Sequence, residues 1–330
     1  MKEKFMLKSV QLKLSKIKYG GDSIGDDIRV EIEILGKFLR IDKRIKAGTA
    51  TEINQEMSRI ETDRESFYAE ISITVIEKDL LFNDVGSTRG SVKVNTAVIK
   101  PQQFVFEVHV KESRSILRKF WGKKIADFEI TLEATITDVM RYIPNDDEGK
   151  GWLKVRIESN KSIESLPAFL KIRSEYSDNK REYFTPLEGT HRDKLVSAKL
   201  QRDGSSNLLS GVQHKPVARA FYSISKKTLT LNGKVYATVD YKNALWEKGL
   251  YDIEIPDYPH SGGARYEEDA PRAKTWFKIG HSGERYLHTG GRSLGCITVI
   301  ETARWIEIYN ALIKARKGDF MSVGELEVID

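Results

Sequence analysis

The stretch IRVEIEI, residues 28–34, alternates aliphatic and charged side chains without a break. Successive side chains of a β-strand point to opposite faces, so this alternation predicts a strand with one buried and one solvated face. The same period of two recurs in EISITV (70–75), FVFEVHV (104–110) and FEITLEATI (128–136). Many half-buried strands in one region are typical of a β-sandwich, which we predict for residues 1–141.

One segment of this region breaks the alternation. In GTATEINQEM, residues 48–57, Thr49 and Glu52 have the spacing of a capping box and precede Ile53 and Met57. A capping box satisfies backbone N–H groups at the start of a helix, and apolar residues four apart share one helical face. We therefore expect a short helix here.

The next segment, YIPNDDEGKGW (142–152), is polar and contains proline and glycine, which favours a domain boundary. After it, WLKVRIESN and AFLKIRSEY read as strands, and we predict a small β unit over residues 151–201. The stretch RDGSSNLLSGVQHKP, residues 202–216, has the composition of a linker.

From residue 217 onward the chain consists of short strand-like segments. TLTLNGKVY places Asn-Gly between two of them, which is a strong hairpin signal. Further on, residues at helical spacing run from Trp305 to Arg316, with Thr302 placed as an N-cap and Gly318 as the stop. We predict a β-rich domain over 217–330 with one packed helix, and a mainly β chain overall.

The composition is that of a globular protein and restricts its chemistry. The 330 residues include 54 basic and 48 acidic side chains, for a net charge of +6, and a single cysteine. One cysteine cannot form an internal disulfide, and zinc sites built on several thiolates are excluded. The N-terminus lacks the apolar run of a secretory signal, and no apolar stretch is long enough to predict a membrane-spanning helix.

The densest basic cluster is SRSILRKFWGKK, residues 113–124, in which five cations flank two aromatic residues. The cations are Arg114, Arg118, Lys119, Lys123 and Lys124, and the aromatic residues are Phe120 and Trp121. Such a cluster can contact an anionic surface, or it can be a solvated strand end with its aromatic rings turned inward. We favour the second interpretation and predict no nucleic-acid partner, while a membrane surface or a protein partner stays open for the N-terminal domain.

Two stretches of the predicted sandwich are similar to a C2 domain. VIEKDLLFNDVGSTRGSVKV (75–94) has a strand, an acidic loop and a second strand, and YGGDSIGDDIRVEIEI (19–34) resembles the first acidic loop of that family. The resemblance implies Asp27, Asp79 and Asp84 as candidate calcium ligands, although the full set of five loop aspartates is not visible. The alternative is that these short acidic side chains only form turns.

The stretch YLHTGGRSLGCITV, residues 286–299, contains the only cysteine, Cys296. A lone cysteine is either a small buried hydrophobe or a nucleophile. Gly295 before it leaves backbone N–H groups open to a developing oxyanion, and His288 can act as a base if its strand folds beside the cysteine. Arg292 together with the histidine is expected to lower the thiol pKa toward neutrality. We place His260, in another loop, at the surface.

These residues resemble the L,D-transpeptidase catalytic domain. The resemblance runs from YSISKKTLTLNGKVYATVDY through KGLYDIEIPD to RYLHTGGRSLGCITV, over about 110 residues, and is most specific at SLGCI. It implies Cys296 as the nucleophile and His288 as the base, with Ser293 and Gly295 shaping the turn of the oxyanion hole. His281, fifteen residues before the cysteine, is the alternative base.

Two positions depart from that family. Leu294 and Thr298 stand where members often have a histidine and an arginine. Recognition of a substrate carboxylate is therefore expected from other groups in this region. The candidates are Arg292, Arg285, the loop around Arg265, His281, Tyr286 and Gly291.

The resemblance implies acyl transfer on peptidoglycan stem peptides without a metal or an organic cofactor. The thioacyl enzyme is resolved either by an amine acceptor or by water, the latter as in an L,D-carboxypeptidase or a toxin-like hydrolase directed at a foreign wall. A non-catalytic β-rich protein that binds a membrane or a surface is the alternative from another class. We expect action at the cell wall or in the periplasm, with the cytoplasm as the other location, and a targeting or substrate-positioning role for the N-terminal β domains.

Overall fold

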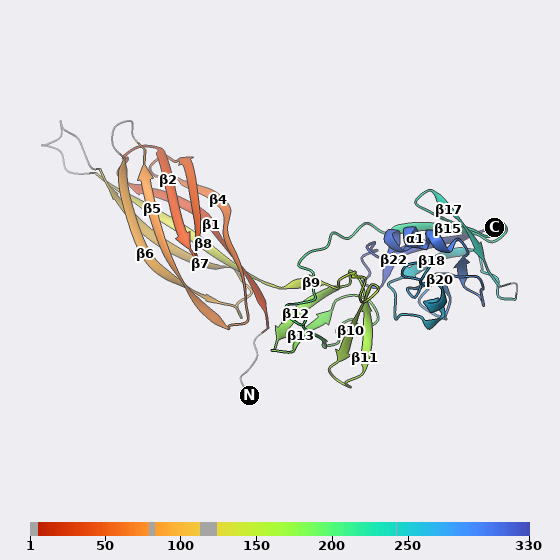
Figure 1. The fold of residues 1–330 in the computed structure, drawn as a ribbon. Helices are drawn as coiled ribbons and strands as arrows, with labels where there is room; N and C mark the ends of the chain where they lie inside the picture. Colours follow the sequence, from red (N-terminus) through yellow and green to blue (C-terminus); the bar gives the residue numbers. More distant parts are fainter. Residues whose placement is uncertain (1–5, 79–82, 113–123, 242) are drawn as a thin grey trace. The chain divides into compact units, whose positions relative to one another are not determined.

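The computed structural model describes residues 6–78, 83–112, 124–241 and 243–330. Contacts divide the chain into two compact units, Met1–Val139 and Met140–Asp330 (Figure 1). Both consist mainly of β-strands, which confirms the predicted fold class. Within the described part of the chain, no helix is long and apolar enough to cross a membrane.

The first unit is a sandwich of two four-stranded antiparallel sheets. One sheet has the order β4 (Ala50–Thr62), β1 (Lys8–Gly21), β8 (Ile125–Asp138), β7 (Gln102–Lys111). The other has the order β3 (Lys37–Arg44), β2 (Asp27–Ile34), β5 (Ser66–Glu77), β6 (Asp84–Asn95). The alternating aliphatic residues supply the core as predicted: Ile28, Val30, Ile32 and Ile34 are each 1% exposed.

The predicted helix at residues 48–57 is wrong, because residues 50–57 belong to β4. It pairs with β1 over almost its whole length, and that pairing has register shifts between Leu12 and Lys13 and between Leu14 and Lys16. Each shift places an extra residue in β4, and Asn54 at one of them has a φ of 53°. Such bulges change the period of two, so that the apolar residues acquire a spacing that imitates a helix.

The second unit contains two sheets. A six-stranded sheet has the order β11 (Ile163–Pro167), β10 (Trp152–Ile157), β14 (Val196–Lys199), β13 (Arg181–Pro186), β12 (Lys171–Ser177), β9 (Met140–Tyr142). An eight-stranded sheet has the order β18 (Gly249–Glu254), β22 (Ser322–Ile329), β15 (Ala218–Ser223), β16 (Thr228–Leu231), β17 (Lys234–Val239), β21 (Ile297–Val299), β20 (Tyr286–Thr289), β19 (Phe277–Lys278). One buried apolar cluster runs from Ile143 to Val328, so residues 151–201 and 217–330 share a core.

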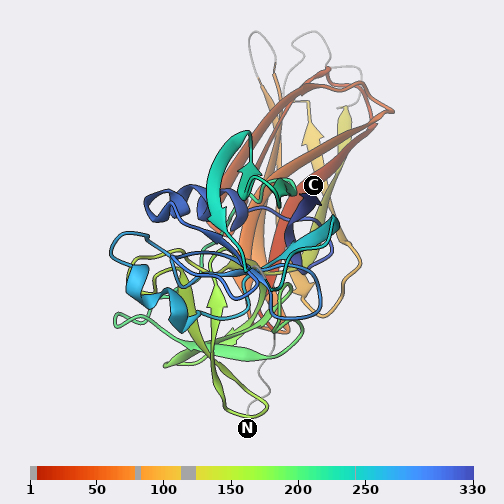
Figure 2. The ribbon, with the colours of Figure 1, turned by 90° about the vertical axis from the view of Figure 1, so that its right-hand side faces the viewer.

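Helix α1 (Trp305–Leu312) follows a 3₁₀ turn, η2 (Thr302–Arg304), and is visible in blue in Figure 2. It buries four side chains in the core of the second unit: Trp305, Ile308, Tyr309 and Leu312. Thr302 is therefore not an N-cap, and the helix ends before the predicted stop at Gly318. It ends because Lys215 forms backbone hydrogen bonds with Lys314 and Arg316, which draws this stretch out of the helix.

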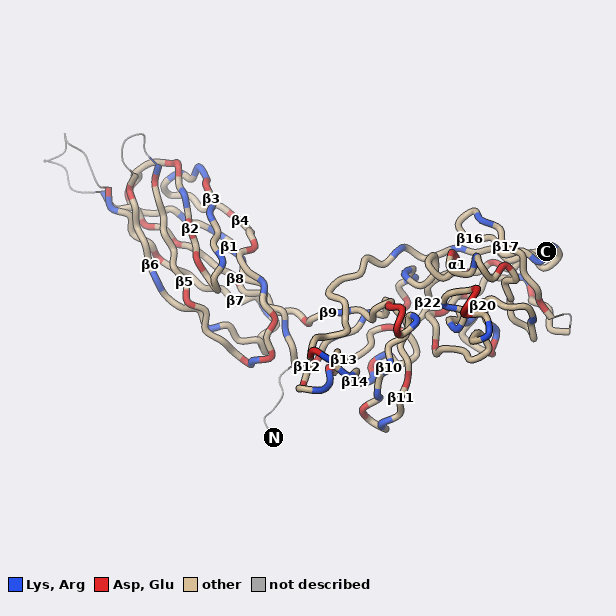
Figure 3. Tube along the Cα trace, viewed as in Figure 1, with Lys and Arg blue, Asp and Glu red and all other residues tan. Residues whose placement is uncertain are grey.

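Charged side chains of both signs are interspersed along both units (Figure 3). Residues 113–123 of the predicted basic cluster lie outside the described residues, as does the candidate calcium ligand Asp79. Lys124, the last cation of that cluster, donates a hydrogen bond to the backbone oxygen of Ser23 at 3.0 Å.

Candidate active site

Strand β20 carries the candidate base His288, and strand β21 begins directly after the candidate nucleophile Cys296. β20 and β21 are parallel, with Leu287 opposite Ile297 and His288 opposite Thr298. The core-facing side chains Phe277, Leu287 and Ile297 are at most 1% exposed. Because side chains alternate along a strand, the residues between them share the other face.

On that face the side chains form two rows across the sheet. The register pairs Lys278 with Tyr286 and His288 with Thr298, and the Trp276 ring stacks on the His288 ring. Cys296 directly precedes β21, and a hydrogen bond links its thiol to the Tyr286 backbone. One residue further along the β20–β21 register, Cys296 would stand opposite Tyr286 and diagonal to His288. The sequence analysis made a role for His288 conditional on its strand folding beside the cysteine, and β20 pairs with the strand that begins directly after Cys296.

A tight turn at residues 293–296 presents the cysteine. The Ser293 hydroxyl accepts a hydrogen bond from the Gly295 N–H at 3.2 Å and donates one to the Cys296 carbonyl at 2.7 Å. Gly295 has a φ of +123°, a conformation that side chains disfavour, whereas the nearest contact of an added Cβ would be an ordinary 3.6 Å to Ala244. Glycine is thus required here by its backbone conformation rather than by lack of space.

The Cys296 thiol is partly buried and directly precedes β21. Burial raises its pKa above the usual 9.0, while the Tyr286 backbone and the positive charge of Arg285 act in the opposite direction. The expectation that Arg292 and the histidine lower the thiol pKa toward neutrality is therefore wrong for the free protein. Burial costs the charged thiolate more solvation energy than it gains from electrostatic attraction to the guanidinium of Arg285.

The His288 imidazole is almost fully buried and holds two hydrogen bonds. Its Nδ1 lies 2.9 Å from the Thr289 carbonyl and its Nε2 lies 3.1 Å from the Thr298 hydroxyl oxygen. Since a carbonyl can only accept, Nδ1 carries the proton and Nε2 accepts from Thr298. Burial lowers the pKa of His288 to about 4, so the ring is neutral at pH 7. Among the described residues, no hydrogen bond joins this ring to the thiol.

A column of stacked rings holds His288 in place. The rings are, in order, Tyr258, His260, Trp276 and His288, with centroid separations of 4.1, 4.4 and 4.0 Å. The prediction that His260 lies at the surface is wrong: it is 7% exposed, and its Nε2 lies 3.1 Å from Asp257 Oδ1. The alternation in WFK (276–278) and YLH (286–288) indicates that Trp276 and His288 point away from the core. No local sequence pattern indicates that the loop with His260 returns to the same strands.

His281, the alternative base, lies elsewhere. Its Nε2 is 2.8 Å from Asp252 Oδ2 and its Nδ1 is 3.0 Å from Glu254 Oε1. The hydrogen bond to Asp252 raises the pKa of His281 above its usual 6.5, which favours a cation held between two carboxylates. A ring fixed in this way is poorly placed to accept a proton from Cys296.

Of the other cationic candidates, Arg285 is the one whose charge reaches the thiol. Its guanidinium lies over the Trp246 ring at 4.7 Å from the centroid, and its Nη1 donates to the Leu245 backbone oxygen at 3.3 Å. Arg292 is exposed, and its backbone oxygen lies 3.3 Å from the Thr298 hydroxyl. Arg265 lies over the Tyr266 ring at 4.8 Å.

The two remaining candidates, Tyr286 and Gly291, use their polar groups in internal hydrogen bonds. Tyr286 is 6% exposed and donates from its hydroxyl to Asp257 Oδ2 at 3.1 Å. The N–H of Gly291 donates to the Tyr266 hydroxyl at 2.9 Å, which fastens the loop after β20. Both residues thus contribute to the shape of the site.

The calcium candidates of the first unit do not assemble into a site within the described residues. Asp27 starts β2, and Asp84 is 4% exposed at the start of β6 opposite Glu77. Across the described ranges, no group of three or more His, Cys, Asp or Glu side chains is arranged to hold a metal ion.

Comparison with known proteins adds little to this geometry. No family model matches the chain, and no curated protein matches it. A C2 domain of plant extended synaptotagmin 1 is similar over 38% of this chain and 95% of that chain, with 14% identity and a TM-score of 0.21. Human GIVD cytosolic phospholipase A2, in complex with an inhibitor and terbium chloride, covers 66% of this chain and 34% of its own, with 10% identity and a TM-score of 0.24. Likenesses at this level do not indicate a function.

Proposed function

We propose that the protein is a cysteine-dependent acyltransferase that acts on peptidoglycan stem peptides, in the manner of an L,D-transpeptidase. The observation that carries the proposal is the parallel pairing of β20, which contains His288, with β21, which begins directly after Cys296. The thiol stands at a glycine turn and is partly exposed, and the imidazole is neutral with an unprotonated Nε2. These are the parts that nucleophilic catalysis with a general base requires.

In the proposed reaction, Cys296 Sγ attacks the carbonyl of the third stem residue, a diamino acid. A sulfur–carbon bond forms, the amide bond to the terminal D-amino acid breaks, and the thiol proton passes by way of His288 Nε2 to the leaving amine. An amine then attacks the thioester and gives a cross-link or an exchanged D-amino acid, or water attacks and gives a carboxypeptidase product. No external redox partner takes part in either route.

The Thr298 hydroxyl can donate its hydrogen bond to either of two acceptors, and its choice decides whether His288 Nε2 is available for the proposed proton transfer. Its hydroxyl oxygen lies 3.1 Å from His288 Nε2 and 3.3 Å from the Arg292 carbonyl. Rotation of the hydroxyl hydrogen toward Arg292 releases the lone pair of Nε2 for the thiol proton. The thiol and the imidazole are both uncharged before substrate binds, so general-base transfer during attack fits better than a preformed ion pair.

A non-catalytic binding protein is the second candidate. The observations that favour it are the raised pKa of Cys296 and the involvement of both His288 nitrogens in other hydrogen bonds. For the first unit, we propose a targeting or substrate-positioning role through a membrane surface or a protein partner. The cell wall or the periplasm is the corresponding site of action.

The test is mass spectrometry of the products formed from stem tetrapeptides, with and without an added D-amino acid. Loss of the terminal residue is expected for the wild type, and mass exchange identifies transfer rather than hydrolysis. Cys296→Ala should abolish both products, and His288→Ala should reduce them strongly. Full turnover by Cys296→Ala would exclude every cysteine mechanism, and absence of turnover by the wild type would favour the binding protein.

A further inference from the structure

The cysteine loop, residues 290–296, makes an unusually short connection between two parallel strands. A parallel pair usually needs a crossover of about a dozen residues or more. Here β20 ends at Thr289 and β21 begins at Ile297, so the chain must turn back sharply within the loop. Cys296 is the last residue of this loop, and the contacts that fix the loop therefore also fix the position of the thiol.

One side chain from another segment holds the cysteine loop. Within the loop and its strands, the N–H of Gly290 donates to the Val299 carbonyl at 3.1 Å. Among the described residues, the hydrogen bond that reaches the backbone of the loop from outside β20 and β21 comes from Tyr266, whose hydroxyl accepts the N–H of Gly291 at 2.9 Å. The ring packs on the loop as well, since a Cβ added at Gly290 would lie 3.0 Å from Tyr266 Cε2. Tyr266 thus contacts two consecutive residues of the cysteine loop.

Tyr266 reaches the cysteine loop from a backbone that is itself held in place. It is the last residue of the 3₁₀ helix η1 (Ser261–Tyr266). An isolated bridge pairs Pro259 with Thr275 at the base of this segment, and the Tyr266 carbonyl accepts the N–H of Ala270 at 2.7 Å. We refer to residues 259–275 as the Tyr266 loop.

The polar segment 142–152, which the sequence predicts as a domain boundary, contacts the Tyr266 loop. Lys150 Nζ lies 2.8 Å from Glu267 Oε2, and Trp152 Nε1 donates to the Thr275 hydroxyl oxygen at 3.2 Å. Glu267 directly follows Tyr266 in the chain. The segment therefore anchors the Tyr266 loop beside the residue that holds the cysteine loop.

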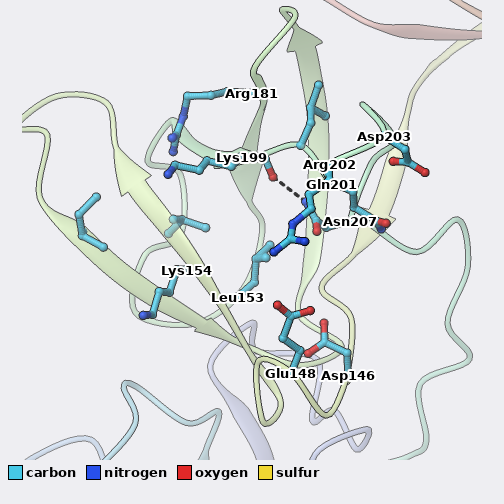
Figure 4. A pocket seen from close by; sticks show the side chains of 13 residues that line it. Asp146, Glu148, Leu153, Lys154, Arg181, Lys199, Gln201, Arg202, Asp203 and Asn207 are labelled. Carbon is cyan, nitrogen blue, oxygen red and sulfur yellow. Dashed lines mark hydrogen bonds between the residues drawn. The ribbon is translucent and has the colours of Figure 1, made fainter.

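Figure 4 shows another side of the same segment. Asp146 and Glu148 lie close together there and line a cavity of about 1050 Å³ along the six-stranded sheet. Lys150, just beyond them, is directed to Glu267 instead. The segment thus connects the six-stranded sheet with the candidate active site.

We propose that Tyr266 is a positioning residue whose hydroxyl fixes the cysteine loop and thereby holds Cys296 beside the strand of His288. The role rests on the proposed function, because the thiol that is positioned is the proposed nucleophile. Without the hydroxyl, the exposed N–H of Gly291 bonds to water, and the loop gains conformations in which the thiol leaves its place. Lys150 acts on the same loop through Glu267 and does not contact the substrate.

The first test is alkylation of Cys296 by iodoacetamide at pH 8, which reports on the thiol without any substrate. Tyr266→Phe removes the hydroxyl and keeps the ring. Because the thiol is partly buried, a loosened loop should speed up alkylation about fivefold, the factor by which one ordinary hydrogen bond shifts a local opening equilibrium. Tyr222→Phe is the matched control, since it loses a hydroxyl hydrogen bond of 3.0 Å to Asp240 elsewhere in the eight-stranded sheet and should alkylate like the wild type.

The second test is turnover of the stem tetrapeptide by the same variants. In Tyr266→Phe, kcat should fall at least about tenfold with little change in KM, because a displacement of about 1 Å slows a positioned reaction strongly and the hydroxyl is bonded to the loop. Tyr222→Phe should keep both constants. Faster alkylation with slower turnover supports the positioning role. An alkylation rate within about twofold of the wild type, an equal increase in Tyr222→Phe, or an unchanged kcat overturns it.

A failure of the proposed function gives a different result. If the wild type does not process the stem peptide and Tyr266→Phe still alkylates faster than both the wild type and Tyr222→Phe, Tyr266 positions the thiol and the proposed function is wrong. Glu267→Gln should also speed up alkylation, by a smaller factor, because it weakens the contact with Lys150. Its exposed neighbour provides the control Glu268→Gln, and equal rates in the two glutamine variants overturn the part assigned to Lys150.

Discussion

The Nε2 atom of His288 lies 3.1 Å from the Thr298 hydroxyl oxygen, across the parallel pairing of β20 and β21. The hydroxyl donates in this contact, because Nδ1 must carry the ring proton that it donates to the Thr289 carbonyl. It also joins the candidate base to the strand that begins directly after the candidate nucleophile. The geometry of the proposed site therefore depends on one buried hydroxyl.

Replacing Thr298 by valine removes this hydroxyl at nearly constant volume. The buried Nε2 acceptor would then have no donor, and we expect the free energy of unfolding to fall by about 1–3 kcal/mol. Urea unfolding followed by tryptophan fluorescence measures the change. Thr298→Ser keeps the hydroxyl and should retain more of the lost stability. Equal stability of the valine variant and the wild type would show that the hydrogen bond is not formed in solution.

The depressed pKa of His288 predicts how stability depends on pH. Its pKa is about 4 in the folded protein and close to 6.5 in the unfolded chain, so the unfolded chain binds the extra proton first. The free energy of unfolding should therefore be unaffected by this group above pH 6.5, and should fall between pH 6.5 and 4 by roughly 3 kcal/mol. Comparison of urea unfolding at pH 7.5 and 4.5 tests this for the wild type. In His288→Gln the same pH change should have a smaller effect, and an identical pH dependence would contradict the assignment.

Gly295→Ala should strain the turn that presents the cysteine. Alanine at a φ of +123° is unfavourable, and we expect a loss of about 1–3 kcal/mol of unfolding free energy. Gly291→Ala lies in the same loop without a positive φ and leaves its N–H in place, so it is the matched control for stability. Thermal unfolding of the two variants compares them directly, and an equal loss in both would refute the conformational argument.

The reactivity of the free thiol should follow its raised pKa. Alkylation of Cys296 by iodoacetamide should be slow at pH 7 and should accelerate about tenfold per pH unit up to pH 9, because only the thiolate reacts. Arg285→Gln removes a nearby positive charge and should slow the reaction further at fixed pH, whereas Arg285→Lys should behave more like the wild type. A rate that is already maximal at pH 7 would mean that an ion pair with an imidazole exists in the free protein.

The sequence predicted those parts of the molecule in which local pattern and tertiary packing agree. The alternation at residues 28–34 identified a buried strand face, and the Asn-Gly turn at residues 232–233 correctly predicted the β16–β17 hairpin. The helix expected at residues 48–57 failed because two bulges in β4 altered the strand period. The helix after Thr302 was expected to be too long, because backbone hydrogen bonds with Lys215 could not be foreseen from local spacing.

In the candidate site, too, local sequence pattern predicted some features, and tertiary packing determined others that the sequence did not predict. The strand of His288 pairs with the strand that begins directly after Cys296, and both lie in one short stretch of sequence. The sign of the shift in the thiol pKa depends on burial by distant segments, and it was predicted incorrectly. Trp276, Asp257 and His260 reach the site from a loop whose path is set by packing, so no sequence motif identified them.

The intact mass of the protein after brief incubation with a stem tetrapeptide tests the central claim most directly. If Cys296 forms a thioester, the wild type should gain the mass of the stem without its terminal residue, and peptide mapping should place the adduct on Cys296. Cys296→Ala should gain nothing, and hydroxylamine should remove the adduct from the wild type. An unmodified wild type that nevertheless releases the terminal residue, or an adduct mapped to another side chain, would contradict the account.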